Sequence, residues 1–259
     1  MQSDYKPILV QTSPEFSEIE IYFVHDLHYG SADHNEKKWN SLKREIVAQP
    51  NRYVIFLGDY CENAVAGSKS DIYTQTASPF QQKEWFTNQL IELSERTLCV
   101  TPGNHEDNRI TKLCGLFPVY DCAKEAGIAD LYRHHFAFVD IGVGNGGHGK
   151  DKQAHYVGYV VHRMRDCKMY SSADFVEGID FAAFGHDHDP KDHPRGKLSY
   201  DAKNKTVSLK SIEVINCGSF MEYGGYGVKA AYRPLSDKCY KLILGGGKKK
   251  SMKTLGFYV

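Results

Sequence analysis

Apolar residues come in short bursts along this chain, and polar stretches separate one burst from the next. The bursts are rich in β-branched and aromatic side chains and are too short for most helices, so they predict β-strands. In the first half of the chain they lie at 18–26, 52–59 and 98–104. In the second half they lie at 134–143, 156–163, 181–187, 207–219, 238–245 and 254–259.

Two stretches between the early bursts have helical character, 35–49 and 78–95. In the second, Ser78 and Pro79 form a suitable N-cap and first-turn pair. Its apolar stripe, which predicts a core-facing side, consists of Trp85, Leu90 and Leu93. Strands that alternate with helices, followed by a strand-rich second half, predict the α/β class with mixed sheets. No repeat or low-complexity linker interrupts the sequence, which favours one domain over residues 1–259.

Bulk composition narrows the class of protein only a little. Of the 259 residues, 41% are hydrophobic and 25% are charged, as in globular rather than disordered chains. Lys and Arg together number 32, as do Asp and Glu, so no basic excess indicates a nucleic-acid partner. The first residues lack the apolar core of a signal peptide. No apolar run approaches the roughly 18 residues of a membrane span, so no membrane partner is expected.

The cysteines carry a weaker signal. Seven are scattered along the chain, and none stands in a C-x-x-C pair. Their odd number and spacing argue against a disulfide framework and against a thiolate zinc site. We therefore expect a reduced protein with a cytoplasmic location.

Polar residues suited to metal binding follow the ends of five predicted strands. They are Asp26 and His28, then Asp59, then Asn104 and His105, then His162, and finally His186 and His188. In α/β sheets the loops at the carboxyl ends of the strands meet at one edge, where ligands bind. The pattern therefore predicts that these side chains form a single site.

The residue types at this edge suit phosphate-ester hydrolysis. Two cations about 3.5–4 Å apart hold the attacking and leaving oxygens and produce hydroxide at neutral pH. Such ions need hard oxygen donors, neutral imidazoles and a carboxylate that bridges both ions. The set that meets this description is Asp26, His28, Asp59, Asn104, His162, His186 and His188. With only two aspartates against two divalent ions, the site would be positive and would attract a phosphate.

The same residues stand in short motifs whose order resembles that of the calcineurin-like metallophosphoesterases. The motifs are D-x-H (26–28), G-D (58–59), G-N-H-E (103–106), a strand-terminal His162 and G-H-x-H (185–188). The resemblance covers roughly residues 20–190, and N-C-G-S-F (216–220) looks like its continuation. It implies a two-sheet β-sandwich flanked by helices, the four-layer α/β/β/α metallophosphoesterase fold. Its motif core would span about 20–220, and the C-terminal strands would complete the second sheet.

The resemblance also implies a role for each residue. Two divalent metal ions would be held, the first by Asp26, His28 and His188, the second by Asn104, His162 and His186, and both by Asp59. His105 would face the substrate and stabilise or protonate the leaving oxygen, while a hydroxide between the metals attacks phosphorus. The donor set tolerates manganese, iron, zinc or nickel, and the resemblance favours Mn²⁺.

The chain departs from the protein Ser/Thr phosphatases of this family after its G-D motif. Asn63 stands where those enzymes have a substrate-gripping Arg, which argues against phosphoprotein activity. Glu62 stands where they have the Asp that orients the catalytic His, and it is a candidate partner of His105. Arg109, three residues after G-N-H-E, is a candidate to grip a phosphate oxygen because its planar fork suits that contact.

Other histidines have simpler interpretations. His148 and His155 are alternatives to His162 as a ligand, but His162 is preferred because it stands at a strand exit. His25 should point away from Asp26 along the strand and is interpreted as structural. The histidines expected at the surface are His34, His134, His135 and His193.

Glycine-rich stretches and tyrosines are also ambiguous. The segment 245–253, GGGKKKSMK, is interpreted as a solvated hairpin turn or a flexible loop rather than a phosphate-binding patch. The segments 142–150 and 222–227 lack a P-loop pattern and are interpreted as loops. The tyrosines that are candidates to stack a base or sugar are Tyr60, Tyr223 and Tyr226.

Three functions follow from these observations. The favoured one is hydrolysis of a phosphodiester, either a nucleotide or a nucleic acid. The alternative is a phosphomonoesterase, including a protein phosphatase with altered substrate contacts. The third is a catalytically silent binding module that keeps the fold, as the retromer subunit of this superfamily does. That module would be expected to have lost ligands, whereas every ligand position here holds a suitable residue. Oligomeric state is not predicted.

Overall fold

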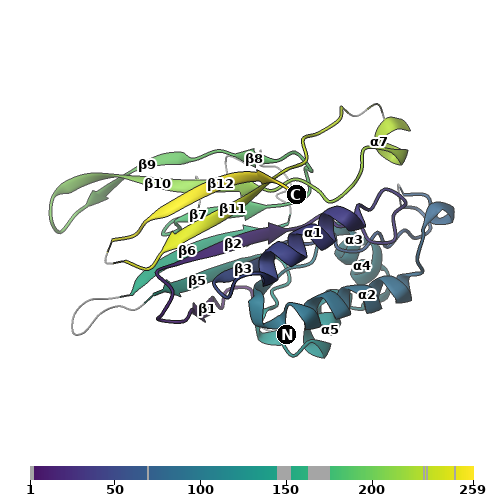
Figure 1. Cartoon of the computed structure of the whole chain (residues 1–259), viewed down its shortest axis with the longest axis horizontal. Helices are drawn as coiled ribbons and strands as arrows, with labels where there is room; N and C mark the ends of the chain where they lie inside the picture. The colour runs from purple at the N-terminus through teal and green to yellow at the C-terminus, as the bar shows by residue number, and fades with distance from the viewer. Residues whose placement is uncertain are drawn as a thin grey trace.

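The computed structural model describes residues 3–68, 70–144, 153–162, 176–229, 231, 233–247 and 249–259. Two mixed β-sheets pack face to face at its centre (Figure 1). The five-stranded sheet has the order β12 (Met252–Tyr258), β11 (Lys238–Gly245), β2 (Glu18–Val24), β3 (Arg52–Phe56) and β4 (Thr97–Val100). Its strands β2, β3 and β4 are parallel, whereas β11 is antiparallel to both of its neighbours.

The seven-stranded sheet holds the strands of the second half and one strand near the N-terminus. Its order is β1 (Ile8–Gln11), β5 (Ala137–Val143), β6 (Ala154–Val161), β7 (Phe181–Phe184), β10 (Thr206–Asn216) and β8 (Lys191–Asp192), with β9 (Arg195–Asp201) paired to β10. Strands β6, β7 and β10 are parallel to one another, and β5 is antiparallel to β6. The parallel strands of both sheets deliver their carboxyl ends to one edge of the sandwich.

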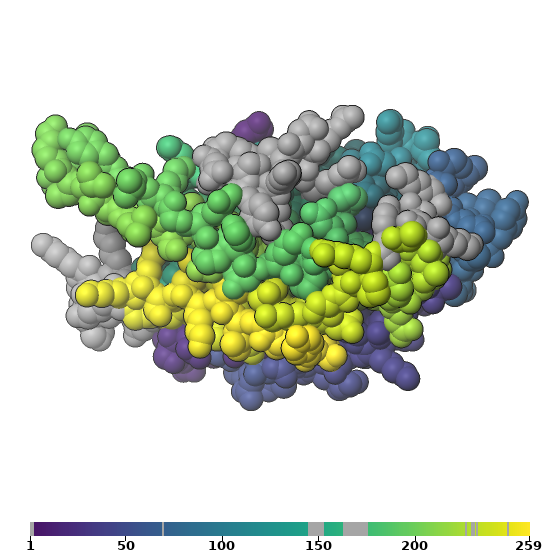
Figure 2. Space-filling model, turned by 90° about the horizontal axis from the view of Figure 1, so that it is seen from above, coloured from purple at the N-terminus to yellow at the C-terminus, as the bar shows by residue number. Residues whose placement is uncertain are grey.

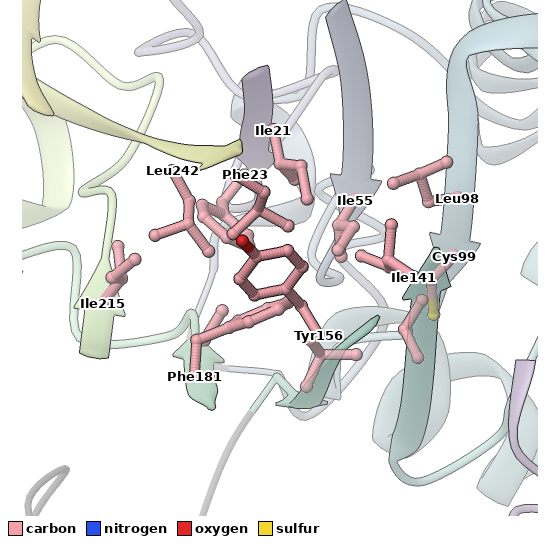
Figure 3. Packing of buried hydrophobic residues seen from close by; sticks show 14 of the residues in the cluster. Ile21, Phe23, Ile55, Leu98, Cys99, Ile141, Tyr156, Phe181, Ile215 and Leu242 are labelled. Atoms are coloured by element: carbon pink, nitrogen blue, oxygen red, sulfur yellow. The ribbon is translucent and has the colours of Figure 1, made fainter. Parts of the chain in front are cut away.

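The inner faces of the two sheets share one apolar core (Figure 3). Side chains alternate along β2, so Ile21 and Phe23 point toward the seven-stranded sheet. Phe181 and Tyr156 meet them from that sheet. The Tyr156 hydroxyl donates a hydrogen bond to a backbone carbonyl of β11 (2.7 Å), which satisfies its polar atom. This packing fixes the sheets relative to each other and thereby positions the loops at their ends.

Three helices cover the outer face of the five-stranded sheet: α1 (Glu36–Val47), α2 (Pro79–Glu92) and α5 (Pro118–Glu125). Val24 of β2 and Phe56 of β3 point outward and pack against Trp39 of α1 and Phe86 of α2. The predicted sandwich of two mixed sheets flanked by helices is therefore confirmed.

Both predicted helices begin and end close to the expected residues. Ser78 and the third helical residue form a capping box at the start of α2, and Pro79 occupies its first turn. On the predicted stripe of that helix, Leu90 and Leu93 are fully buried, whereas Trp85 is only half-buried. The shorter helical segments are η1 (Ile72–Thr74), η2 (Ser94–Arg96), α3 (Asn104–Glu106), η3 (Asp107–Thr111), α4 (Lys112–Cys114), η4 (Ala129–Leu131) and α7 (Gly225–Lys229).

The nine predicted strands are all present, whereas β1, β8 and β9 were not predicted from the sequence. β1 and β8 have only 4 and 2 residues, too few to show a period. β9 is mostly polar, and together with the first half of β10 it forms a hairpin that projects from the body of the molecule (Figure 2). The predicted turn at 245–253 joins the antiparallel strands β11 and β12. Most of the predicted loop at 142–150 lies outside the described residues, and 222–227 leads into α7.

Two further observations concern broad class. Within the described ranges, no helix is both long enough and apolar enough to cross a membrane. The described cysteines, which exclude Cys167, are all free thiols: Cys61, Cys99, Cys114, Cys122, Cys217 and Cys239.

Candidate metal centre

The predicted ligands meet at the edge where the carboxyl ends of β2, β3, β4, β6 and β7 converge. The five-stranded sheet contributes Asp26, His28, Asp59 and Asn104, and the seven-stranded sheet contributes His162, His186 and His188. Donor atoms that lie within 4.8 Å of one another form three groups, which are Asp26–His28–His188, His28–Asp59–His105 and Asp59–His162–His186. His28 and Asp59 each belong to two groups, so the three groups form one continuous centre.

The first group surrounds Asp26, which is fully buried. Its Oδ1 atom lies 3.4 Å from His28 Nε2 and 3.2 Å from His188 Nε2. Those two nitrogen atoms are 3.3 Å apart. Despite its burial, Asp26 Oδ1 has no well-formed hydrogen bond. Burying a carboxylate oxygen without a partner is costly, and a divalent cation among these three atoms would remove that cost.

The group of Asp59, His162 and His186 is arranged around His162. Its Nε2 atom lies 3.2 Å from both Asp59 Oδ2 and Asn104 Oδ1. Its other ring nitrogen, Nδ1, donates to the Leu57 carbonyl (2.6 Å). This bond fixes the tautomer and turns the Nε2 lone pair toward the centre, as in many metal-binding histidines. The His186 ring lies beside it, with ring centroids 5.5 Å apart.

His25 has a closer relation to the centre than the sequence indicated. We expected it to point away from Asp26, but its Nδ1 lies 2.5 Å from Asp26 Oδ2. Strand β2 ends at Val24, so the alternation of a strand no longer applies at His25. His25 Nε2 accepts from the Cys217 N–H (3.2 Å), so the ring proton is on Nδ1 and is donated to Asp26. His25 therefore orients the carboxylate.

The backbone is strained at several of the predicted ligands. Among the described residues, eight non-glycine residues have positive φ, and five of them are predicted ligands: Asp26, His28, Asp59, His186 and His188. A left-handed conformation costs roughly 1–2 kcal/mol for such residues. Strain of this kind collects where the surrounding structure imposes a functional geometry. The exits of β2, β3 and β7 thus hold their ligands in positions that an ordinary turn would not provide.

Two glycines let the G-D and G-N-H-E motifs pack against each other. A Cβ atom at Gly103 would lie 2.1 Å from Asp59 Oδ1, and one at Gly58 would lie 2.4 Å from the Gly103 backbone nitrogen. Gly58 also has φ +96°, which disfavours other residues. The motif glycines are therefore required by the close approach of the two loops.

Glu106 holds these two loops together by hydrogen bonds, although no role is predicted for it from the sequence. Its carboxylate accepts the backbone N–H groups of Asp59 (3.0 Å), Tyr60 (2.8 Å), Cys61 (3.0 Å) and Gly103 (2.8 Å). Burial and the charge of Asp59 raise the pKa of Glu106 to about 7. The signal was present as the last letter of the G-N-H-E motif, but the four donors are brought together only by the fold.

His105 lies at the mouth of the centre in contact with Arg109. Arg109 Nη2 is 2.8 Å from His105 Nε2, and a guanidinium can only donate, so this nitrogen accepts. His105 Nδ1 then donates to the Glu62 carbonyl (2.9 Å). Burial lowers the pKa of His105 to about 4. The ring is therefore neutral, and the adjacent guanidinium disfavours a metal ion on it.

Glu62 contacts more than the one histidine that the sequence indicated. Its Oε2 atom lies 3.2 Å from His28 Nδ1 and 3.7 Å from His105 Nδ1. Arg109 Nη1 donates to its carbonyl (2.7 Å) and contacts Oε1 (3.1 Å). Glu62 thus supports a predicted ligand with its side chain and His105 with its backbone.

Charge in the centre is shared between carboxylates and imidazoles. Burial raises the pKa of Asp26, but contacts with His188, His25 and His28 outweigh it and hold the pKa well below its usual value. Burial lowers the pKa of His162, but the charge of Asp59 outweighs it and raises the pKa to about 9. In the metal-free protein, protons therefore balance the carboxylates, and a bound cation would displace them.

The remaining candidates lie away from the centre. His155 is exposed and contacts Asp140 (2.9 Å), and His148 is outside the described residues. His135 and His193 are at the surface as predicted, but His34 and His134 are half-buried and hydrogen-bonded. Of the tyrosines, Tyr60 is fully buried against Phe86, so it cannot stack a substrate. Tyr223 is exposed, and the Tyr226 side chain is outside the described part.

Comparison with known proteins identifies the family. The model of the family described as calcineurin-like phosphoesterase matches residues 19–190 of the 259, and the chain belongs to that family. Among solved structures, the chain is similar to Vps29 from Chaetomium thermophilum, with 11% identity and a TM-score of 0.36, over 93% of this chain and 97% of that one. Comparison with curated proteins finds no match. The family and the Asp/His groups together indicate a metal-dependent phosphoesterase domain with a centre for two divalent ions.

Proposed function

We propose that this protein hydrolyses a phosphodiester of a nucleotide or nucleic acid in a centre that holds two divalent ions. The observation that carries the proposal is the set of three donor groups joined through His28 and Asp59. Two bound cations would neutralise the phosphate and supply a nucleophile from water at neutral pH. Hard oxygen and imidazole donors without thiolates fit Mn²⁺, which we propose as the native metal.

In this proposal each predicted ligand keeps the role that the family resemblance implies. Asp26, His28 and His188 hold the first ion, Asn104, His162 and His186 hold the second, and Asp59 bridges them. The fit is supported by the buried Asp26 Oδ1 atom, which lacks a well-formed hydrogen bond, and by the hydrogen bond that orients the His162 ring.

His105 and Arg109 act together on the leaving oxygen. Because His105 is neutral and its Nε2 accepts from Arg109, the guanidinium supplies the positive charge at this position. His105 donates a proton from Nε2 only if the substrate displaces Arg109 and the ring changes tautomer. We therefore propose that Arg109 stabilises the leaving oxygen and that His105 positions the Arg109 side chain.

The charge around Arg109 favours a diester over a monoester. A phosphomonoester is a dianion near neutral pH, whereas a diester has a single negative charge. Here Arg109 is partly neutralised by the Glu62 carboxylate at 3.1 Å. Asn63 stands where the protein phosphatases have their substrate-gripping arginine. Less positive charge is left for a second phosphate charge, so a diester is the better substrate.

The test is hydrolysis of two nitrophenyl esters by protein first stripped of metal. Bis(p-nitrophenyl) phosphate reports diesterase activity, and p-nitrophenyl phosphate reports monoesterase activity. Each is assayed after addition of Mn²⁺, Zn²⁺, Ni²⁺ or Mg²⁺, with Asp59→Asn as the control.

We expect metal-dependent cleavage of the diester that disappears in Asp59→Asn. Cleavage of the monoester alone would support a phosphomonoesterase instead. No cleavage of either ester by metal-loaded protein would support a catalytically silent binding module.

A further inference from the structure

A cavity of about 400 Å³ opens beside the second predicted metal position. Its described lining includes Asn104, Asp107, Asn108, Phe136, Tyr159 and His162. Asn104 and His162 line this cavity and are also predicted ligands of the second ion, so the cavity adjoins the centre directly. Its volume lies within the ~300–1,000 Å³ typical of small-molecule sites.

One wall of the cavity is aromatic and firmly held. Phe136 and Tyr159 lie with ring centroids 5.8 Å apart at an interplanar angle of 40°. Phe138 contacts both rings from behind, at 6.1 and 5.4 Å, yet it does not line the cavity. Tyr159 is buried and packs against the half-buried Phe136, so the Phe136 ring presents a preformed surface for stacking.

The rest of the described lining offers hydrogen-bonding groups but no Lys or Arg side chain. Asp107 and Asn108 come from η3, the turn that follows G-N-H-E, and His134 Nε2 lies 3.4 Å from Asp107 Oδ1. Asn108 is exposed, and its amide has no hydrogen-bond partner among the described residues. None of the eleven described lining residues is Lys or Arg. Among these described residues a second phosphate would find no Lys or Arg side chain, whereas a neutral planar group with polar edges would find matching partners.

We propose that this cavity binds the nucleobase of the substrate, so that the substrate is a nucleoside-containing phosphodiester. The proposal rests on the proposed function, because the metal centre supplies the position of the phosphate. Phe136 would stack the base while Tyr159 packs against Phe136, and Asn108 would pair with the edge of the base, as amide side chains do with bases. A phenyl ring could also stack, but it has no edge groups for Asn108 and Asp107.

The test compares ligands that differ only by the base. Adenosine 5′-monophosphate and ribose 5-phosphate are measured as competitive inhibitors of bis(p-nitrophenyl) phosphate hydrolysis by the Mn²⁺-loaded protein. Isothermal titration of both compounds into the same protein reports binding without turnover. We expect the nucleotide to bind at least about 10-fold more tightly than the sugar phosphate, because stacking of one base has a comparable effect in other proteins.

The variants place the effect in the cavity. Phe136→Leu should lower that preference roughly 10-fold. Phe138→Leu, the same change two residues further along the chain and outside the described lining, should not lower it. Asn108→Ala is at an exposed position where folding is not at stake, and it should lower the preference several-fold.

The outcomes separate this inference from the proposed function. Equal binding of the two compounds, or equal losses in the two phenylalanine variants, would overturn the nucleobase site even if the diester is cleaved. Absence of diester cleavage would instead count against the proposed function, and the titration would still decide whether the base binds.

Discussion

The two sheets make different contributions to the same centre. The five-stranded sheet supplies both aspartates and the asparagine, together with one histidine, whereas the seven-stranded sheet supplies three histidines: His162, His186 and His188. All the negative charge of the ligand set therefore comes from the five-stranded sheet. Its two carboxylates are almost fully buried and are held by His25 and by the loop that Glu106 fixes.

This difference has a physical reason. A buried carboxylate is costly unless it is held by hydrogen bonds and paired with positive charge, so its loop needs additional support. An imidazole needs only one hydrogen bond to fix its orientation, and His162 Nδ1 donates this bond to the Leu57 carbonyl. The five-stranded sheet is covered by helices α1, α2 and α5. Substitutions on the two sheets should therefore differ in both size and kind.

The largest effect is expected for Asp59→Asn. It removes the carboxylate shared by two donor groups, so metal-dependent hydrolysis of bis(p-nitrophenyl) phosphate should fall to the uncatalysed background. His162→Asn, which replaces one neutral donor of the other sheet, should weaken Mn²⁺ binding but regain activity in excess Mn²⁺. A metal titration of both variants checks this. Equal and irreversible losses would show that the two sheets contribute alike.

The next effect is expected for Glu106→Gln. Each oxygen of Glu106 accepts two backbone N–H groups, and a glutamine offers only one acceptor oxygen, so two of the four donors lose their partner. We expect the free energy of unfolding to fall by about 2–3 kcal/mol, together with a loss of metal affinity. Urea unfolding with and without Mn²⁺ measures both. A variant with unchanged stability would show that the loop of Asp59 is held by other contacts.

A smaller effect is expected for His25→Phe. This change keeps the buried ring but removes the hydrogen bond to Asp26 Oδ2. Loss of such an orienting bond lowers metal affinity or activity by roughly 10–100-fold in other metal sites. Isothermal titration with Mn²⁺ measures the change, and His155→Phe at an exposed position is the control. Unchanged affinity would leave His25 a purely structural residue.

The smallest effect concerns pH. The pKa of His162 rises from 6.5 to about 9 in the folded protein, because the charge of Asp59 outweighs burial. A raised folded pKa contributes stability that is complete below pH 6.5 and is lost as the pH rises toward 9. The free energy of unfolding of metal-stripped protein should therefore fall between pH 6.5 and 9, with a smaller fall in His162→Gln. Mn²⁺ should reduce this dependence, since it displaces the same proton.

Much of the fold could be predicted because the apolar pattern is local. The strands β2, β3 and β4 are largely buried on both faces, so each appears in the sequence as a short apolar burst. The capping pair at Ser78 marks the start of α2. β9 escaped prediction because its exposed residues show no buried face. His34 and His134 were placed at the surface because a lone histidine in a polar stretch carries no signal of its tertiary neighbours.

The sequence by itself determined the family and the set of candidate ligands, since short motifs in order at strand ends can be recognised without coordinates. Only the tertiary structure decided how those residues meet. It brought Glu106 to four N–H groups, His25 to Asp26 and Arg109 to His105, and it opened a cavity between η3 and the seven-stranded sheet. The physical reason is that chemical type is carried by each residue alone. Hydrogen bonds, burial and tautomers depend on neighbours that are distant in the chain.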